Sequence, residues 1–225
     1  GTIARSKNIP LHVDAAQAFG RLPIDVDAWH ADLLTISGHK SHGPIGVGTL
    51  YVRRGVTLDA VMHGGHHETG HRPGTENVPA IVGFGRTAEL IAEQLSTDMT
   101  RMTRLRDQLL EAIATRVTGV RVNGHPVHRL CNTVNVEFED VSGEALVMQL
   151  DLEGIAASTG AACSSGRREP SHVLLAIGRS AAEAQHSVRF SLGRMTTASE
   201  IETTAAAVER LVPQIRTAGL ETVAG

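Results

Sequence analysis

Three short apolar runs punctuate the first part of the chain. They cover Ile9–Val13, Ala31–Ser37 and Val47–Arg54. The first run is apolar without alternation and the second resembles it, which is typical of strands buried on both faces of a parallel sheet. The third is reached through a turn at Gly43 and Pro44. The interval between the first two runs has room for one short crossover of the kind that joins parallel strands. The pattern therefore predicts an α/β fold in which Ile9–Val13 is a central strand.

Apolar residues then recur at helical spacing. From Asn77 onward they follow one another every three or four positions, first up to about residue 95 and again from residue 99. The polar residues Ser96, Thr97 and Asp98 interrupt the pattern, which predicts a break between two helices and a hinge between two domains. The stretch before the helices, His63–Thr75, has no periodicity and reads as an ordered loop.

The last part of the chain predicts a smaller α+β unit. Its expected strands and helices are strands at 120–124, 132–139, 155–157 and 187–192, and helices near 144–150, 170–178 and 197–216. Thr197 and Glu200 form the Ser/Thr-x-x-Glu pattern of a helix capping box. We therefore expect two domains, a partial large domain over 1–95 and a small C-terminal domain over 96–225.

Composition narrows the class of protein. The 225 residues are 41% hydrophobic and 20% charged, with a net charge of −3, and they contain no basic block, which argues against nucleic acid or an anionic membrane as a partner. No apolar segment is long enough to span a bilayer. Two cysteines are too few for a disulfide framework, and no signal peptide opens the sequence, so a cytoplasmic location is expected.

Lys40 is the first candidate for chemistry. It follows the second apolar run within "SGHK", among small residues and a histidine. Desolvation at the end of a buried strand would favour the neutral, nucleophilic form of the lysine amine. The alternative, a solvated lysine in a loop at a strand end, stays open on this residue alone.

A carboxylate stands at the end of the neighbouring run. Asp14 lies where open α/β sheets bind ligands, and it could pair with a cationic heterocycle or simply cap the following turn. A pyridoxal phosphate enzyme requires a lysine that binds the cofactor covalently and an acid against the pyridinium nitrogen. The polar residues expected at the two adjacent strand ends are Asp14, Gln17, Ser37, His39 and Lys40. Together they favour a role for Asp14 in ligand binding over a role in capping the following turn.

Cys163 lies in "STGAACSSGRREPSH", a stretch of small residues with two arginines close behind. Small residues favour a mobile loop, and nearby positive charge favours the thiolate form of a cysteine. This pattern predicts a nucleophile or carrier rather than a small buried side chain. Cys131, at the start of a predicted strand, fits the buried alternative.

Arg189 and four histidines complete the candidates. Arg189 is a single arginine inside an apolar strand, where it either binds the carboxylate of an amino-acid substrate or forms an internal salt bridge. The histidines are His63, His66, His67 and His71. Their spacing is too loose for a zinc site, and a loop that lines a phosphate or cofactor is the favoured interpretation, so no metal is expected.

Taken together, the chain resembles the NifS/IscS-type cysteine desulfurases, in the class V aminotransferase group of fold-type I pyridoxal phosphate enzymes. The motifs that carry the resemblance are "HVDAAQAFGRLPID", "SGHKSHGPIGVGTLYVRR", "MHGGHHETGHRPGT", "STGAACSSG", "EPSHVL" and "SVRFSLGRMTT". The resemblance implies the C-terminal half of a large parallel-sheet domain followed by a small α+β domain. The family's chains normally begin well before "IPLHVDAAQ", so a fragment that binds the cofactor weakly is expected.

The resemblance also implies a role for each candidate. Pyridoxal 5′-phosphate would be the cofactor, L-cysteine the substrate and L-alanine the product. Lys40 would hold the cofactor, Asp14 would pair with its ring nitrogen and Gln17 with its phenolic oxygen. Ser37 and His39 would contact the phosphate, while Thr75 would reach the phosphate of a partner subunit in a homodimer. Arg189 would bind the substrate carboxylate. Cys163 would carry a persulfide to acceptors such as an iron–sulfur scaffold.

Two other functions remain open from the sequence. One is a different reaction on the same scaffold, such as that of a selenocysteine lyase or an aminotransferase, although Cys163 in its loop speaks against the aminotransferase. The other is a non-catalytic remnant that serves dimerisation or binds a sulfur acceptor. The expected absence of the N-terminal part favours this last alternative.

Overall fold

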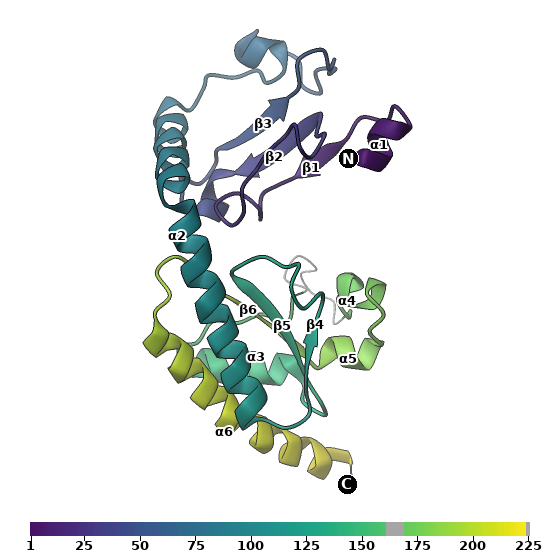
Figure 1. Ribbon diagram of the computed structural model, residues 1–225, viewed down its shortest axis with the longest axis vertical. Coiled ribbons are helices and arrows are strands. Elements are labelled where there is room, and N and C mark those ends of the chain that lie inside the picture. Colours follow the sequence, from purple (N-terminus) through teal and green to yellow (C-terminus); the bar gives the residue numbers. More distant parts are fainter. Residues whose placement is uncertain (161–168, 224–225) are drawn as a thin grey trace. The chain divides into compact units, whose positions relative to one another are not determined.

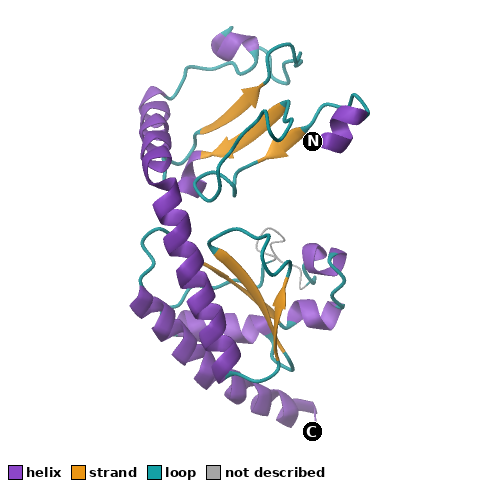
Figure 2. Ribbon diagram, viewed as in Figure 1, coloured by secondary structure: helices purple, strands orange, loops and turns teal. Residues whose placement is uncertain are grey.

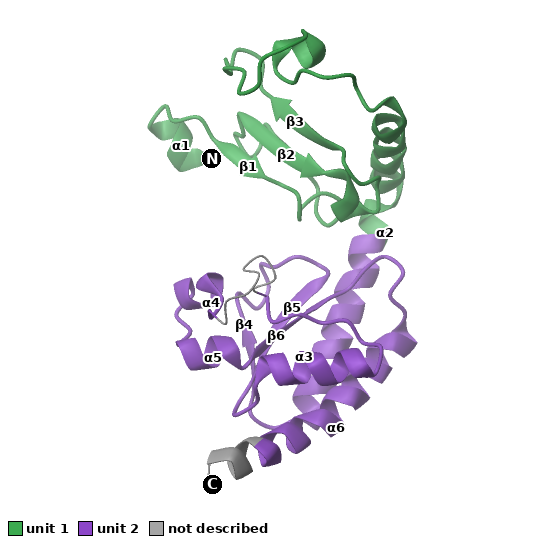
Figure 3. Ribbon diagram, turned by 180° about the vertical axis from the view of Figure 1, so that it is seen from behind, with its two compact units in different colours: residues 1–97 green, residues 98–225 purple. Residues whose placement is uncertain are grey.

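A computed structural model describes residues 1–160 and 169–223 of the chain. The chain divides into two compact units, Gly1–Thr97 and Asp98–Gly225 (Figure 3). Helix α2, Val78–Arg116, is continuous through the boundary, so the predicted break at residues 96–98 is wrong. Serine, threonine and aspartate cost a helix only about 0.5 kcal/mol each relative to alanine. Ala80 and Phe84 before the polar residues, and Met102, Leu105 and Leu109 after them, are buried, and this burial outweighs the small local penalty.

The first unit contains a three-stranded sheet in the order β1-β2-β3 (Figures 1 and 2). Its strands are β1 His12–Asp14, β2 Leu33–Ser37 and β3 Gly48–Val52. β1 runs parallel to β2, as the sequence predicts, whereas β3 runs antiparallel to β2. The sheet is therefore mixed, and each strand is shorter than its apolar run because the flanking residues form turns.

β1 is an edge strand, not the central strand that its composition predicts. Among the described residues it pairs with β2 alone, and both His12 and Asp14 are exposed. β3 is exposed as well, with Leu50 49% and Val52 38% accessible. An apolar sequence allows a strand to be buried on both faces, but burial also requires neighbouring segments. Within the described residues these strands have few neighbours.

The predicted crossover between the parallel strands β1 and β2 is present, but it contains no helix. Residues 15–31 form successive turns instead, with the small side chains of Ala15 and Ala31 fully buried at their two ends. Phe19 from these turns meets Phe84 of α2 edge to face, with ring centroids 6.0 Å apart. This contact fixes the turns that follow Asp14 against the first half of α2.

Short helices lie before β1 and in the other connections of the first unit. They are α1 Thr2–Ser6 and the 3₁₀ helices η1 Gly38–Ser41 and η2 His67–Gly70. The loop after η1 packs closely on α2, because a side chain at Gly83 would come within 2.8 Å of Pro44. Glycine at this helical position therefore lets α2 support the segment that carries Lys40.

The second unit contains an antiparallel sheet in the order β4-β5-β6 (Figure 1). Its elements are β4 Val120–Asn123, β5 Thr133–Phe138, α3 Gly143–Leu152, α4 His172–Ala176, α5 Ala181–Gln185, β6 Ser187–Ser191 and α6 Ala198–Val223. The predicted strand at 155–157 is wrong, since these residues form no strand and only the following Ser158 makes an isolated bridge, to Arg189.

One face of this sheet builds the core of the second unit. Val134, Val136 and Phe138 of β5 alternate toward helices α2, α3 and α6, as a period of two requires. The largest fully buried side chains that join them include Leu105, Leu109, Ile113, Leu146, Leu150, Val188 and Val208. The opposite face of the sheet is polar and carries Arg189.

The final helix begins at the predicted capping box. The Glu200 carboxylate accepts the Thr197 N–H at 2.7 Å, and the Thr197 hydroxyl accepts the Glu200 N–H at 3.2 Å. The first of these bonds holds the pKa of Glu200 below its ordinary value. None of the described helices is both long enough and apolar enough to cross a membrane.

Candidate functional site

The candidate cofactor residues of the first unit meet at one edge of its sheet. Asp14 pairs with Thr35 at the end of the parallel ladder between β1 and β2. Parallel strands end on the same side, so the turns after Asp14 and the η1 helix after Ser37 emerge together. Lys40 lies in η1, one turn beyond the end of β2. The edge thus carries a carboxylate and an amine from neighbouring strands.

Asp14 makes the turn-capping bond that the sequence left open as an alternative. One of its carboxylate oxygens accepts the backbone N–H of Ala16 at 2.9 Å. Its other oxygen has no hydrogen-bond partner among the described residues, and the side chain is exposed. The cap therefore uses one oxygen and leaves the second available to a cation.

Lys40 is exposed, so its expected desolvation is not found. Its ammonium forms no hydrogen bond or ion pair with any residue that the structure describes, while its backbone carbonyl accepts a bond from Arg21 at 2.9 Å. The burial prediction failed because Lys40 lies in η1, beyond the end of β2, where His39 beside it is also exposed. The amine is nevertheless available for covalent chemistry, because nothing in the described chain occupies it.

Three further predicted residues lie around this edge, and one lies outside it. Ser37 ends β2, while the side chains of Gln17 and His39 are exposed on the two emerging segments. Thr75 belongs to the loop between η2 and α2 rather than to these segments, and it is also exposed. The structure therefore brings together the segments of five candidates and leaves Thr75 on a separate loop.

The histidine-rich loop has a constrained backbone. Glu68 and Thr69 adopt left-handed conformations with φ of 47° and 55°, and the following Gly70 has φ of 89°. The Thr69 hydroxyl lies 3.2 Å from the His71 ring. Within residues 1–160 and 169–223, no group of three or more histidine, cysteine, aspartate or glutamate side chains is arranged to hold a metal ion. The Nδ1 atom of His67 is buried and has no hydrogen-bond partner among the described residues.

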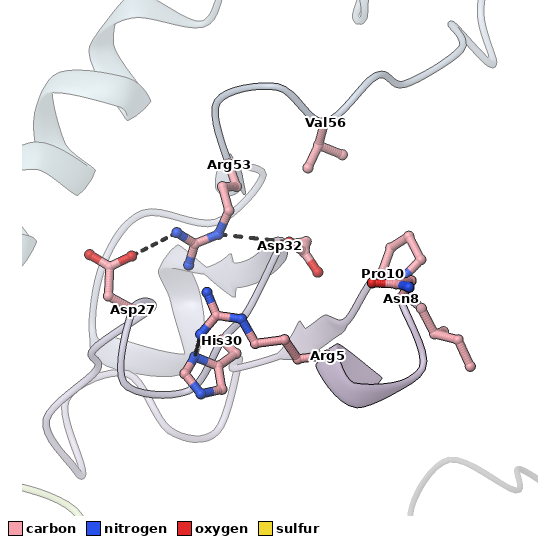
Figure 4. A pocket seen from close by; sticks show the side chains of 9 residues that line it. Arg5, Asn8, Pro10, Asp27, His30, Asp32, Arg53 and Val56 are labelled. Atoms are coloured by element: carbon pink, nitrogen blue, oxygen red, sulfur yellow. Dashed lines mark hydrogen bonds and ion pairs between the residues drawn. The ribbon is translucent and has the colours of Figure 1, made fainter. Parts of the chain in front are cut away.

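A cavity of about 520 Å³ lies at the opposite end of the same sheet (Figure 4). Arg53, just after β3, forms an ion pair with Asp27 at 2.7 Å and approaches Asp32, just before β2, at 3.7 Å. The hydrogen bond to Asp27 raises the pKa of Arg53 above its ordinary value. Arg53 also donates to the carbonyls of Val26 and Ala31. These bonds attach the long β1–β2 connection to the end of β3. The charged residues of the cavity wall therefore stabilise the fold of the first unit.

Arg189 of the second unit fits a ligand better than an internal salt bridge. It is half-buried on the polar face of the sheet, opposite Asn135 of β5. Its guanidinium has no hydrogen bond or ion pair among the described residues, so the internal salt bridge left open by the sequence is not found there. A half-buried guanidinium without a protein acceptor is suited to an external carboxylate.

Sequence reasoning missed a polar row beside Arg189. Asn123, Asn135 and Arg189 are paired across the three strands and share one face. The buried Asn123 amide donates to Asn135 at 2.6 Å and to Ser187 at 3.0 Å, and its oxygen accepts from Arg179 at 2.6 Å. Asparagines inside an apolar strand pattern were the signal that could have identified this row.

The two cysteines differ in what can be said of them. Cys131 is 5% exposed, which confirms the prediction of a buried side chain. Cys163, the predicted nucleophile, lies outside the described residues.

The groups at the Lys40 edge suit pyridoxal phosphate chemically. A free amine can bind an aldehyde covalently, and the unshared oxygen of Asp14 can face a protonated ring nitrogen. Ser37, His39 and Gln17 supply hydroxyl, imidazole and amide groups to bind phosphate and phenolic oxygens. The set thus contains the kinds of group that this cofactor requires.

Comparisons with known proteins agree with this chemistry. The pattern that defines the family described as Aminotransferase class-V matches residues 1–204. A "Cysteine desulfurase IscS" of Methanosarcina thermophila is 44% identical over 216 residues, which are 96% of this chain and 53% of the relative. A protein of the same name from Dictyoglomus turgidum is 43% identical over 96% of this chain and 55% of its own length.

Solved structures show the same similarity. A NifS-like protein from Rickettsia africae superposes with a TM-score of 0.85 at 30% identity, covering 95% of this chain and 56% of that one. SspA in complex with cysteine superposes with a TM-score of 0.68 at 35% identity, covering 87% and 54%. The chain spans about half the length of the curated relatives it matches. The predicted fold class is confirmed, and the chain belongs to the class-V aminotransferase family, with the fold of the NifS-like proteins.

Proposed function

We propose that this chain carries the lysine, substrate-binding and sulfur-accepting residues of a pyridoxal phosphate-dependent cysteine desulfurase. The observation that carries the proposal is the meeting of Asp14 and Lys40 at the ends of two parallel strands, each with a side-chain group that no described residue binds. Its relatives named as cysteine desulfurases support the choice of reaction. L-cysteine is the proposed substrate and L-alanine the product.

The residues of the first unit hold and tune the cofactor. Pyridoxal phosphate, when bound, supplies an electron sink that acidifies the Cα–H bond of an amino acid. Lys40 binds the cofactor covalently and then moves the proton at the substrate Cα. Asp14 keeps the ring nitrogen protonated through its negative charge, and Gln17 orients the phenolic oxygen. Ser37 and His39 bind the phosphate.

The residues of the second unit bind substrate and receive sulfur. Arg189 binds the L-cysteine carboxylate with its two parallel N–H donors. The Cys163 thiolate attacks the substrate sulfur, so a sulfur–sulfur bond forms while the Cβ–S bond breaks. The carbon fragment keeps that electron pair, takes up one proton and leaves as L-alanine. Cys163 is left as a persulfide, whose outer sulfur passes to an acceptor thiol by exchange.

The proposal extends to partners. Thr75, on its own exposed loop, reaches the cofactor phosphate of a second copy, which makes the working enzyme a homodimer. An iron–sulfur scaffold or an enzyme of tRNA thiolation accepts the sulfur, and the location is cytoplasmic. Each of these statements follows from the family resemblance.

One observation favours a second candidate function. Both His12 and Asp14 of β1 are exposed, and so is Lys40. These features suit a non-catalytic module that binds a second copy or a sulfur acceptor. Such a module would release no sulfide from L-cysteine whatever residue stands at position 163.

Intact mass spectrometry with a sulfide assay separates these functions. The protein is incubated with pyridoxal phosphate and L-cysteine, alongside Lys40→Ala and Cys163→Ser variants. A desulfurase forms L-alanine and gains one sulfur atom on Cys163, and both variants lose the sulfur gain. Pyruvate or a transaminated product without bound sulfur would indicate a different reaction on the scaffold. No product at all would favour the non-catalytic module.

A further inference from the structure

The backbone pairing between β1 and β2 ends before the candidate cofactor residues begin. The last paired residues are Asp14 and Thr35, with one additional bond from the Ala15 N–H to the Thr35 carbonyl at 2.9 Å. Beyond this point the backbone segments that follow β1 and β2 separate, the first into the turns after Ala15 and the second into the η1 helix. Gln17 and Lys40 therefore lie on segments that the sheet itself no longer holds together.

Arg21 joins these two segments. Its guanidinium donates one hydrogen bond to the backbone carbonyl of Gln17 at 3.2 Å and another to the backbone carbonyl of Lys40 at 2.9 Å. The bonds come from different nitrogens of one planar group, so a single rigid fork sets the spacing of the two carbonyls. Arg21 is half-buried beneath these segments.

A second bond supports the same junction. The buried Ser41 hydroxyl donates to the Phe19 carbonyl at 3.2 Å, and Phe19 packs on Phe84 of α2. This bond anchors the end of η1 to the middle of the turns. It does not reach Gln17 or Lys40, whose carbonyls are both bound by Arg21.

We infer that Arg21 is a positioning residue that fixes the separation of Gln17 and Lys40 at the cofactor edge. The inference rests on the proposed function, in which these two residues contact the phenolic oxygen and the neighbouring aldehyde carbon of one ring. Because the two groups lie side by side on that ring, a small shift between the segments weakens one contact or the other. A lysine at position 21 cannot replace the arginine fully, since its single ammonium lacks the planar fork.

Two measurements on the full chain test this role. Amide hydrogen exchange without cofactor reports the mobility of residues 16–22 and 38–43, and an absorbance titration with pyridoxal phosphate reports cofactor affinity. The variants are Arg21→Met and Arg21→Lys, with Arg54→Met as the matched control. Arg54 is an exposed arginine of the same unit whose side chain makes no hydrogen bond or ion pair with the described residues.

In Arg21→Met, exchange at residues 38–43 is expected to accelerate about tenfold, and half-saturation should require about tenfold more pyridoxal phosphate. Amides of the β2–β3 ladder and the thermal midpoint should change little. For Arg21→Lys, the exchange rate and the half-saturating concentration should lie between those of Arg21→Met and the parent. For Arg54→Met, both values should match the parent's. The wavelength of the bound-cofactor absorbance should also shift in Arg21→Met, because the phenolic oxygen contact is altered.

Unchanged exchange at residues 38–43 in Arg21→Met would overturn the inference. Acceleration that spreads equally through β2 and β3 would also overturn it, by showing a general stabilising role. If the parent itself shows no binding of pyridoxal phosphate, the proposed function fails, whereas the exchange measurement still decides whether Arg21 joins the two segments.

Discussion

Asp14 and Thr35 face each other at the last position of the parallel pairing between β1 and β2. This pairing determines that the segment carrying Gln17 and the segment carrying Lys40 leave the sheet on the same side. A one-residue slip of β1 would turn Asp14 to the opposite face, because side chains alternate along a strand. The register between two short strands therefore sets the geometry of the candidate cofactor site.

Substitutions of Asp14 can distinguish its hydrogen bond to the turn from its negative charge. Asp14→Asn keeps an oxygen for the Ala16 N–H but removes the charge, whereas Asp14→Ala removes both. We expect the free energy of unfolding of Asp14→Asn to lie within about 0.5 kcal/mol of the parent's value. That of Asp14→Ala should be lower by about 1 kcal/mol more. Both should reduce L-alanine production about 100-fold or more, because the ring nitrogen loses its anion. Denaturant titration and an alanine assay measure the two effects. Parent-like turnover in Asp14→Asn would exclude the proposed role of the carboxylate.

Arg189 should control the affinity for L-cysteine rather than stability. Its guanidinium has no acceptor among the described residues, so Arg189→Met breaks no internal bond that the structure shows. The concentration of L-cysteine needed for half-maximal sulfide release should rise about 10- to 100-fold, as expected for losing hydrogen bonds between charged groups. Arg104→Met, which changes an exposed arginine of α2, is the control and should not alter it. A parent-like half-maximal concentration in Arg189→Met would contradict carboxylate binding.

The cap of α5 should make the second unit sensitive to acid. The backbone N–H of Ser180, and then the Arg121 side chain, hold the pKa of Glu183 at about 2, below its ordinary 4.5. Because the folded pKa is the lower one, the ionised carboxylate stabilises the fold above pH 4.5, and this contribution disappears as the pH falls toward 2. Glu183→Gln should therefore lower Tm at pH 7 by a few degrees.

The Tm difference should narrow steadily between pH 4.5 and about 2. Thermal melts of the parent and Glu183→Gln at pH 7, 4.5 and 3 measure it, with Asp151→Asn as a control on an exposed carboxylate of α3. An equal difference at pH 7 and pH 3 would show that lost packing, not lost charge, is responsible.

The positions of the elements could be predicted from local pattern. Apolar runs located all three strands of the first unit, and the predicted strands at 120–124, 132–139 and 187–192 coincide with β4, β5 and β6, because apolar patterning indicates which segments contribute to a core. The α6 cap was also predicted, since Thr197 and Glu200 bond within a single turn. The same pattern at Ser180 and Glu183, which begins α5, was overlooked although it was equally visible.

Properties that depend on distant neighbours could not be predicted this way. The edge position of β1 depends on which strands surround it, and the exposure of Lys40 depends on which segments cover η1. The role of Arg21 was also invisible, because it acts on backbone carbonyls whose positions no sequence pattern encodes. A simple count would have drawn attention to Lys40, since only two of the 21 lysines and arginines are lysines.

The scarcity of lysines makes the central claim directly measurable. The protein is incubated with pyridoxal phosphate and then with borohydride, which makes a lysine-bound cofactor permanent, and the modified peptide is identified by mass spectrometry. Lys7, the other lysine, is exposed on α1's C-terminal side and provides an internal control. The account predicts cofactor on the Lys40 peptide, lost in Lys40→Ala and retained in Lys7→Ala. Modification of both lysines to the same extent, or of neither, would contradict it.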